Sequence, residues 1–452
     1  MKLHIISRLK DFLDKKITSI ISNKYFTSSL WLLAEKLVRM ILNLLIGVWI
    51  ARYLGPSDFG TLSYVQSIVV IFTTLASLGL DSIVVKKLVE RERKESDILG
   101  SAFFLKLFAS IFILLLLFIF LYIVPNGYSF EGKILALLTF STVFHSFNVI
   151  DFYFQSKVLG KYIAISNIIF LLTSSIVKIA LILIGADVFY FVVALIFDAF
   201  LLAMTFVFIF LLREGRLSLY SWRPKKSICF ELLRESWPLI VSGLIVIIYM
   251  KIDQVMLMHL VGKTELGIYS AAAKVSEVWY FIPMVLANTL FPAILNAKKN
   301  TVKEYHKKLQ FLYDIMVIIA LFISIPMYFL SDIIVTSLYG ADYASAGEVI
   351  RVYIFSLIFV FLGTASSKWF ICEGLQKYSL YRTLVGLFIN IGLNYILIPI
   401  YHGMGAAIAT VISQIFASYL VNLFHPKLRI TFFLHTNSIL ILLRIFGLKF
   451  KV

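Results

Sequence analysis

Charged residues are scarce in this 452-residue chain: they make up 15% of it, whereas a soluble domain carries roughly a quarter. Hydrophobic residues make up 60%, which is more than a soluble core of this size can hide from water. These two figures exclude an ordinary soluble protein and place the chain in a bilayer, where each spanning helix needs about 20 mostly apolar residues.

Cysteine is also nearly absent. Cys229 and Cys372 form no Cys-x-x-Cys pair, so we expect no structural disulfide. The seven histidines, among them an isolated His145, show no metal-ligand spacing, and no phosphate-binding loop of the nucleotide-hydrolase kind occurs. We therefore expect no catalytic residues, no metal site, no cofactor and no ATP hydrolysis within the chain.

Twelve apolar stretches are long enough to span a bilayer, which predicts an all-α membrane protein of two six-helix lobes. They run near 28–51, 60–84, 98–123, 133–155, 161–184, 188–212, 236–260, 266–296, 311–331, 346–370, 378–400 and 403–424. The connections are short. The longest outward-facing one is expected around Ser331 to Ser345, which leaves no room for a catalytic domain outside the membrane.

This pattern divides the chain into five parts. They are a cytoplasmic amphipathic tail (1–27), an N-lobe of helices 1 to 6 (28–212), a basic cytoplasmic linker (213–235), a C-lobe of helices 7 to 12 (236–424) and a cytoplasmic tail (425–452).

The net charge of +17 comes from Lys and Arg in the two tails and in the connections after helices 2, 6 and 8. The alternate connections hold almost none. Short loops rich in Lys and Arg stay cytoplasmic, so both termini are expected inside. We assign the basic excess to orientation and to contact with anionic membrane lipids, not to nucleic acid.

Two short motifs recur in the two halves. Leu54–Ser63 reads L-G-P-S-D-F-G-T-L-S and Val261–Ser270 reads V-G-K-T-E-L-G-I-Y-S, at an offset of 207. Phe154–Tyr162 (F-Q-S-K-V-L-G-K-Y) and Phe370–Tyr378 (F-I-C-E-G-L-Q-K-Y) match at an offset of 216. Two matches in order indicate an internal duplication, which is typical of transporters. Each motif is interpreted as a tight hairpin between two spans, and a direct ligand role stays open.

Ionisable residues at membrane depth cost at least ~2.5 kcal/mol each and commonly mark a substrate or ion pathway. Four deep cations are our candidate substrate-binding residues, and three acids are candidates to carry a coupling proton or sodium ion. The cations are Arg39, Lys178, Lys251 and Lys274, and the acids are Glu35, Asp253 and Glu277.

The spacing of these charges leaves alternatives open. Glu35 with Arg39, and Lys274 with Glu277, can pair along their own helices, so structural pairing and cavity lining are both possible. Lys106 lies near the inner edge, where it can snorkel to water or reach substrate. For Asp81 and Asp151, solvation at a helix end is the favoured interpretation.

The charges do not repeat at the offset of 207: Arg39 corresponds to Val246, and Lys274 to Ser67. A duplicated scaffold with unlike charges suits a single central cavity shared by the two lobes. Buried cations in that cavity suit an anionic substrate, and phosphate is an obvious candidate because Arg and Lys bind it well.

The text E-K-L-V-R followed by A-R-Y-L-G-P-S-D-F-G at helix 1 resembles the opening of Wzx-type polysaccharide flippases, a family of the multidrug/oligosaccharidyl-lipid/polysaccharide exporter superfamily. The text K-I-D-Q-V-M followed by E-L-G-I-Y-S-A-A-A-K-V-S-E resembles that family's second half. The residues that match the family pattern are Glu35, Lys36, Arg39, Asp253, Gln254, Tyr269, Lys274 and Glu277. Lys251 stands where relatives often have Arg.

The resemblance implies a bundle similar to that of multidrug and toxic compound extruders. It implies a cell inner-membrane protein that flips undecaprenyl-diphosphate-linked oligosaccharide for O-antigen or capsule assembly by alternating access, with polysaccharide polymerase and chain-length proteins as partners. A multidrug exporter of the same fold is the first alternative, and a membrane polysaccharide polymerase is the second. The deep cations argue against the exporter, and the short outward connections argue against the polymerase.

Overall fold

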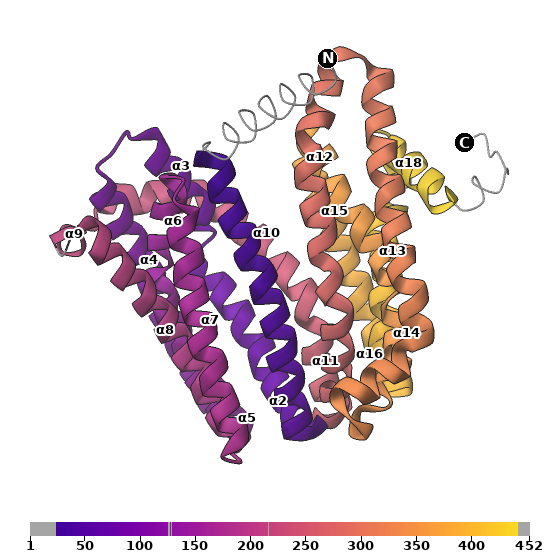
Figure 1. Ribbon diagram of the computed structural model, residues 1–452, viewed down its shortest axis with the longest axis horizontal. Coiled ribbons are helices and arrows are strands. Elements are labelled where there is room, and N and C mark those ends of the chain that lie inside the picture. Colours follow the sequence, from indigo (N-terminus) through magenta and orange to yellow (C-terminus); the bar gives the residue numbers. More distant parts are fainter. Residues whose placement is uncertain (1–23, 125–126, 128, 216, 442–452) are drawn as a thin grey trace, which may run out of the picture. The chain divides into compact units, whose positions relative to one another are not determined.

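The computed structural model describes residues 24–124, 127, 129–215 and 217–441, and across these residues the chain is helical with short turns and no strand. Two compact units are present, each a bundle of long helices (Figure 1). The first unit comprises the described residues up to Gly47 together with Val69–Gly243, and the second comprises Val48–Ile68 and the described residues from Leu244 onward. The expected amphipathic tail lies, up to residue 23, outside the described residues.

The first unit is built around an apolar core formed by Leu80, Ile98, Ile150, Phe154 and Phe210 with their neighbours. Its elements are the outer parts of α2 (Lys24–Ser77), then α3 (Leu80–Glu90), α4 (Glu95–Ile123), α5 (Phe130–Thr139), the 3₁₀ helix η1 (Phe140–Asn148), α6 (Val149–Ser156), α7 (Gly160–Leu183), α8 (Val188–Glu214), α9 (Leu217–Tyr220) and the start of α10 (Lys226–Leu260).

The second unit has a larger apolar core, to which the middle of α2 and most later helices contribute. Its further elements are α11 (Lys263–Glu277), η2 (Val278–Tyr280), α12 (Phe281–Asn300), α13 (Val302–Tyr339), η3 (Ala341–Tyr343), α14 (Ala346–Tyr353), α15 (Ser356–Cys372), α16 (Gln376–Ile415), the π-helical turn η4 (Phe416–Leu420), α17 (Val421–Phe424) and α18 (Arg429–Ile439).

Nine helices within the described residues are long and apolar enough to cross a bilayer, or ten if the bent pair α14 and α15 is one span. The predicted all-α, multi-pass membrane fold is therefore confirmed. Two of the nine, Thr27–Glu90 and Gln376–Phe424, have 64 and 49 residues, far more than one crossing needs. Each is interrupted by a non-helical residue, Gly55 or His402, between two expected spans. The count of twelve stays a prediction.

The connections are shorter than we expected. The outward connection placed around Ser331 to Ser345 is wrong in extent, because α13 continues to Tyr339 and Gly340 then turns the chain with φ of 94°. In the expected linker, α10 already begins at Lys226, so the last part of that linker is helical.

The first repeated motif keeps its backbone geometry in both copies. Gly55 (φ 71°, ψ 171°) and Gly262 (φ 95°, ψ 179°) occupy the same region, which is essentially restricted to glycine. The closing glycines then contact the opposite copy: a Cβ on Gly60 would collide with the carbonyl of Lys263, and a Cβ on Gly267 with the carbonyl of Pro56. The two copies thus meet reciprocally inside the second unit.

This contact helps to explain why Val48–Ile68 belongs to the second unit. Phe59 and Ala51 are buried in that unit's core, and the hydroxyl of Tyr343 donates to the carbonyl of Ala51 at 2.8 Å. The sequence assigns these residues to the N-lobe, and the boundaries of the two lobes stay a prediction.

The second repeated motif ends its helix in the same way in both copies. Leu159 donates its N–H to the carbonyl of Phe154 at 2.9 Å, and Leu375 donates to Phe370 at 2.8 Å. This is a Schellman ending, which needs a left-handed residue just before the donor. That residue is Gly374 in the second copy (φ 68°) but Val158 in the first (φ 57°).

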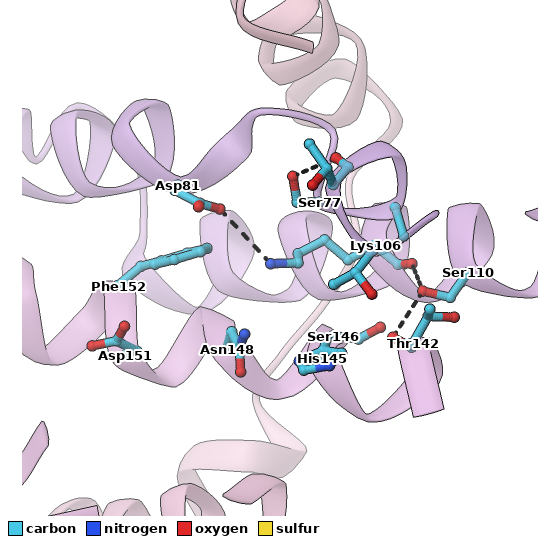
Figure 2. A pocket seen from close by; sticks show the side chains of 13 residues that line it. Ser77, Asp81, Lys106, Ser110, Thr142, His145, Ser146, Asn148, Asp151 and Phe152 are labelled. Carbon is cyan, nitrogen blue, oxygen red and sulfur yellow. Dashed lines mark hydrogen bonds and ion pairs between the residues drawn. The ribbon is translucent and has the colours of Figure 1, made fainter. Parts of the chain in front are cut away.

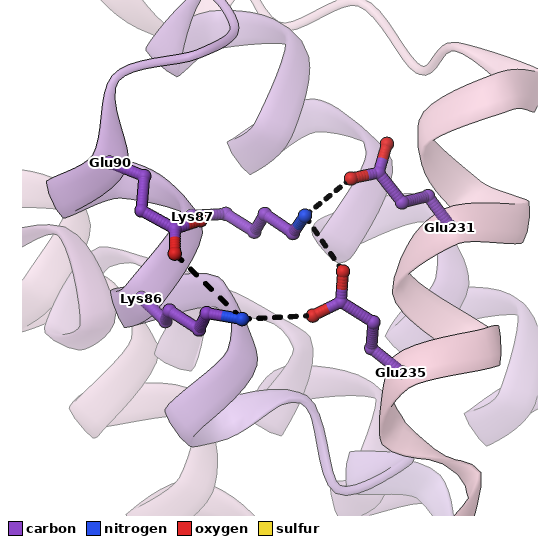
Figure 3. Close-up of polar contacts among 5 residues, drawn as sticks. All are labelled: Lys86, Lys87, Glu90, Glu231 and Glu235. Carbon is purple, nitrogen blue, oxygen red and sulfur yellow. Dashed lines mark hydrogen bonds and ion pairs between the residues drawn. The ribbon is translucent and has the colours of Figure 1, made fainter.

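Ion pairs fasten the start of α10 to α3 within the first unit (Figure 3). The ammonium group of Lys87 lies 2.5 Å from Glu231 and 2.7 Å from Glu235, and Lys86 lies 3.5 Å from Glu235 and 3.8 Å from Glu90. Immediately before α3, a Cβ on Gly79 would touch Leu239 of α10 at 2.9 Å. The start of α10 is therefore closely fitted to α3.

Candidate functional site

The first unit encloses a polar pocket of about 350 Å³ (Figure 2). Its walls come from α2, α3, α4, η1 and α6, so it lies inside one bundle. Eleven of the 13 residues that line it carry polar or charged side chains, which is unusual because small-molecule pockets are mostly apolar. The lining residues are Thr73, Thr74, Ala76, Ser77, Asp81, Lys106, Ser110, Thr142, His145, Ser146, Asn148, Asp151 and Phe152.

Lys106 is the buried cation of this pocket, with 4% of its side chain exposed. Its ammonium group lies 3.9 Å from a carboxylate oxygen of Asp81 and 4.8 Å above the ring of Phe152 (Figure 2). Asp81 is 66% exposed, so it stands at the rim while Lys106 stands inside. A buried ammonium with one distant, solvated partner is costly, which makes Lys106 a functional candidate.

The wall opposite Lys106 is the 3₁₀ helix η1. A 3₁₀ helix has 3.0 residues per turn, so side chains three positions apart eclipse one another. Thr142, His145 and Asn148 are spaced in this way, and Asp151 follows one step later in α6; all four line the pocket. The Ser110 hydroxyl lies 2.8 Å from the carbonyl oxygen of Lys106 and 3.1 Å from that of Thr142, which links α4 to this wall.

The sequence did not reveal this wall. His145 looks isolated when helix 4 is interpreted as an α-helix, and Asp151 is interpreted as a solvated helix end. The signal that could have found them is the polar series T-x-x-H-x-x-N-x-x-D, which has the period of a 3₁₀ helix. The sequence offers Lys106 as a residue that can reach substrate, but it does not show which residues surround this side chain.

The predicted cations of the first unit each have an acidic partner. Arg39 donates from Nε to Glu35 at 2.6 Å, and Glu35 is buried. Lys178 of α7 lies 2.5 Å from Asp198 of α8 and 2.9 Å from the hydroxyl of Ser174. Both cations are therefore charge-compensated, with 40% of the Arg39 side chain and 16% of the Lys178 side chain exposed.

The predicted cations of the second unit are held differently. Lys251 is half-buried in α10, and no ion pair of its ammonium group is found among the described residues. Lys274 of α11 lies 4.5 Å above the ring of Phe59. Glu277, one turn further along α11, accepts a hydrogen bond from the hydroxyl of Tyr353 at 3.0 Å.

Asp253 is the centre of a buried polar network in the second unit. Its carboxylate accepts hydrogen bonds from Tyr269 at 2.7 Å, Thr410 at 2.6 Å and Asn394 at 2.7 Å. Asn390 extends the network, because its side-chain oxygen accepts from Asn394 at 3.0 Å. The carboxylate of Asp253 in α10 is therefore surrounded by hydrogen-bond donors from α11 and α16, and a buried ionisable residue of this kind commonly marks a proton or ion pathway.

Taken together, the long apolar helices, the polar pocket of the first unit and the buried carboxylate network of the second define a multi-pass membrane protein with transporter-like polar sites. Residues 26–298 match the family described as "Polysaccharide biosynthesis protein", and this is more than half of the chain. The chain belongs to this family. Residues 238–396 also match the family described as MatE. The resemblance drawn from the helix motifs is thus confirmed at the level of the family.

Two curated relatives resemble parts of the chain. The capsular polysaccharide biosynthesis protein CapF of Staphylococcus aureus is 26% identical over 167 residues, which is 37% of this chain and 42% of CapF. The probable flippase AglR of Haloferax volcanii is 27% identical over 270 residues, which is 56% of this chain and 52% of AglR. The chain thus spans about half the length of the curated relatives it matches.

Solved transporter structures share the fold over most of the chain. An inward-facing multidrug resistance MATE family transporter of the MOP superfamily superposes with a TM-score of 0.68 at 15% identity, covering 88% of this chain and 96% of that one. The lipid II flippase MurJ, in an inward closed conformation, superposes with a TM-score of 0.68 at 17% identity and covers 93% of both chains. The MATE-like fold is confirmed, whereas the roles of individual site residues stay predictions.

Proposed function

We propose that this protein is a flippase for a lipid-linked oligosaccharide. It would move undecaprenyl-diphosphate-linked repeat units from the cytoplasmic to the periplasmic leaflet of the cell inner membrane, with both termini in the cytoplasm. The use of the product in O-antigen or capsule assembly, and contact with a polymerase and chain-length proteins, belong to this proposal. Transport would proceed by alternating access of the two lobes to a shared cavity.

The polar lining of the first-unit pocket is the observation that carries the proposal. A lipophilic drug would favour apolar walls, whereas Lys106, His145 and Asn148 offer hydrogen bonds to a hydrophilic headgroup. Membership of the polysaccharide biosynthesis family supports the same substrate class. So do the names of the relatives, which include a capsular polysaccharide protein, a probable flippase and a lipid II flippase.

The diphosphate is assigned to the deep cations Arg39, Lys178, Lys251 and Lys274. Lys251 is the strongest of the four, since Arg39 and Lys178 already face carboxylates. Arg in its place would keep the charge and add a bidentate donor.

Complementation of a flippase-deleted host tests the proposal. Expression of the chain should restore surface polysaccharide and remove the accumulated lipid-linked intermediate. We expect Lys251→Met to lower surface polysaccharide by about tenfold or more, because a charge-assisted hydrogen bond to the diphosphate is lost, while Lys251→Arg stays active. Equal display by the wild type and Lys251→Met at matched membrane levels would contradict the assignment of Lys251. Failure of the wild type to clear the intermediate would contradict the function.

Coupling to an ion gradient is assigned to Asp253, with Glu35 and Glu277 as the other candidates. In vesicles that contain the purified protein, an imposed sodium or proton gradient should accelerate transport by the wild type. Asp253→Asn removes the charge with little change of volume, so transport should continue without responding to the gradient. A variant that responds as the wild type does would exclude Asp253 as the coupling residue.

A multidrug exporter is the second candidate, and the MatE match over residues 238–396 favours it. The polar pocket argues against it. If the chain conferred drug resistance that is lost in Lys251→Met, and did not change the level of lipid-linked oligosaccharide, the exporter would be favoured over the flippase.

A further inference from the structure

The 3₁₀ winding of η1 aligns three of its pocket-lining side chains in one row, and Ser146 lines the pocket beside that row. In an α-helix, two residues three positions apart differ by about 300° of rotation about the helix axis, so they miss a full turn by about 60°. Over the three such steps from Thr142 to Asp151 this offset would add up to about 180°, and Asp151 would lie on the side of the helix opposite Thr142. In the 3₁₀ helix, three residues make one full turn, so Thr142, His145 and Asn148 form one row along the helix. The row is flanked by Phe144, which packs edge-on against Phe200 of α8 at 5.4 Å and so holds the other face of η1 in the bundle.

A 3₁₀ helix of nine residues is unusual, since runs longer than three or four residues are uncommon. Such a stretch inside a spanning segment is expected to have a compensating role. Here its effect is to place a row of hydrogen-bonding side chains opposite the buried Lys106.

The charges around the pocket do not favour an anion. Lys106 is opposed by Asp81 at 3.9 Å, and Asp151 adds a second carboxylate, so the local charge is not positive. A phosphate here would meet two carboxylates. The same groups suit a neutral, hydroxyl-rich ligand, because carboxylates accept hydrogen bonds while Lys, Asn and Thr donate them.

Two polar atoms of the pocket wall are buried without a hydrogen-bond partner among the described residues: the hydroxyl of Ser146 and one carboxylate oxygen of Asp151. Unpartnered buried polar atoms are costly, and a ligand hydroxyl would satisfy each of them. The volume of about 350 Å³ is at the lower end of the range for small-molecule sites (~300–1,000 Å³), so it suits a short piece of a glycan and not a polyprenyl tail.

We propose that the η1 row (Thr142, His145 and Asn148), together with Asp151 and Lys106, is a sugar-binding subsite that holds a hydroxyl-rich ring of the transported glycan. This rests on the proposed function and assigns the glycan to the first-unit pocket, apart from the cations that hold the diphosphate. Because of this subsite, the affinity of the protein for its lipid substrate depends on the sugar as well as on the diphosphate.

Binding of two probe lipids to the purified full chain in lipid nanodiscs tests the subsite. One probe is the undecaprenyl-diphosphate-linked oligosaccharide isolated from the flippase-deleted host, and the other is undecaprenyl diphosphate without sugar. The wild type should bind the sugar-bearing lipid more tightly. Asn148→Ala and His145→Ala should each weaken its binding about three- to tenfold, the loss expected for one hydrogen bond, and leave the sugarless lipid unaffected.

Ser141→Ala is the matched control, because Ser141 is buried in the same 3₁₀ helix but does not line the pocket. It should bind both probes as the wild type does. If Asn148→Ala fails to fold, the milder Asn148→Ser replaces it. Equal weakening of both probes by the row variants, or no preference of the wild type for the sugar-bearing lipid, overturns the subsite while the flippase function stands. Failure of the wild type to bind either lipid overturns both.

Discussion

Val158 is a described residue whose backbone conformation suits its side chain poorly. It is β-branched, yet it occupies the left-handed position (φ 57°) that glycine takes in the duplicated motif at residue 374. An L-residue pays about 1–2 kcal/mol for this conformation. The hydrogen bonds of the Schellman ending are nevertheless the same in both copies, so the fold imposes the turn on Val158.

Replacing Val158 by Gly should therefore stabilise the protein. We expect the free energy of unfolding to rise by about 1 kcal/mol, since the relief of strain exceeds the added flexibility of the unfolded chain. The reverse change, Gly374→Val, should lower it by a similar amount. Thermal unfolding midpoints of the purified variants in one detergent measure both, and a lower midpoint for Val158→Gly would show that the turn is not strained.

The sequence predicts which charged residues lie deep in the membrane, but it does not predict their partners. Insertion cost alone identified Lys178 and Asp253 as deep charges that need partners. The partners themselves follow from packing: Asp198 reaches Lys178 from the next helix, and Thr410 reaches Asp253 across 157 positions. No local spacing connects such residues, so ion pairing and cavity lining could not be separated beforehand.

At the scale of elements, η1 is the clearest departure from expectation. The apolar content and length of residues 133–155 predict one continuous α-helix, whereas the structure has α5, a 3₁₀ helix and α6. Hydrophobicity predicts that a segment enters the bilayer, but it does not predict whether the segment forms an α-helix or a 3₁₀ helix. The pocket depends on that winding, which is why the site was only partly foreseen.

The reciprocal contact of the duplicated motifs makes a second prediction. Gly60→Ala and Gly267→Ala each place a methyl group against a backbone carbonyl of the opposite copy, so each should destabilise the second unit by about 1–3 kcal/mol. Gly392→Ala is the matched control: Gly392 is also helical, but a Cβ there meets nothing within 4 Å, so this change should be neutral or slightly stabilising.

Thermal unfolding midpoints measure the three alanine variants. The expected order is Gly392→Ala at or above the wild type, with the two motif variants clearly below it. If Gly60→Ala and Gly392→Ala behaved alike, the close approach of the two copies would not exist in the folded protein.

At the scale of the whole molecule, composition and the pattern of apolar stretches were sufficient for the fold class. The all-helical membrane architecture is confirmed, because length and hydrophobicity govern what a bilayer accepts. The MATE-like form, which only the resemblance of the helix motifs implied, is confirmed as well. The two repeated motifs are visible in the sequence, and in the first of them Gly55 and Gly262 have conformations that other residues rarely adopt. The grouping of Val48–Ile68 with the second unit was not visible, since it depends on core contacts such as that of Tyr343 with Ala51.

The proposed function is the transport of a lipid-linked oligosaccharide across the bilayer. The test uses sealed vesicles that contain the purified chain and the oligosaccharide lipid isolated from the flippase-deleted host. A glycosidase added outside cleaves only the sugar of the outer leaflet, so the protected fraction is the sugar that remains in the inner leaflet. We predict that the protected fraction falls with time in vesicles that contain the wild type, and falls far more slowly with Lys251→Met or in protein-free vesicles. A protected fraction that stays constant in the presence of the wild type, under sodium and proton gradients alike, would contradict the account.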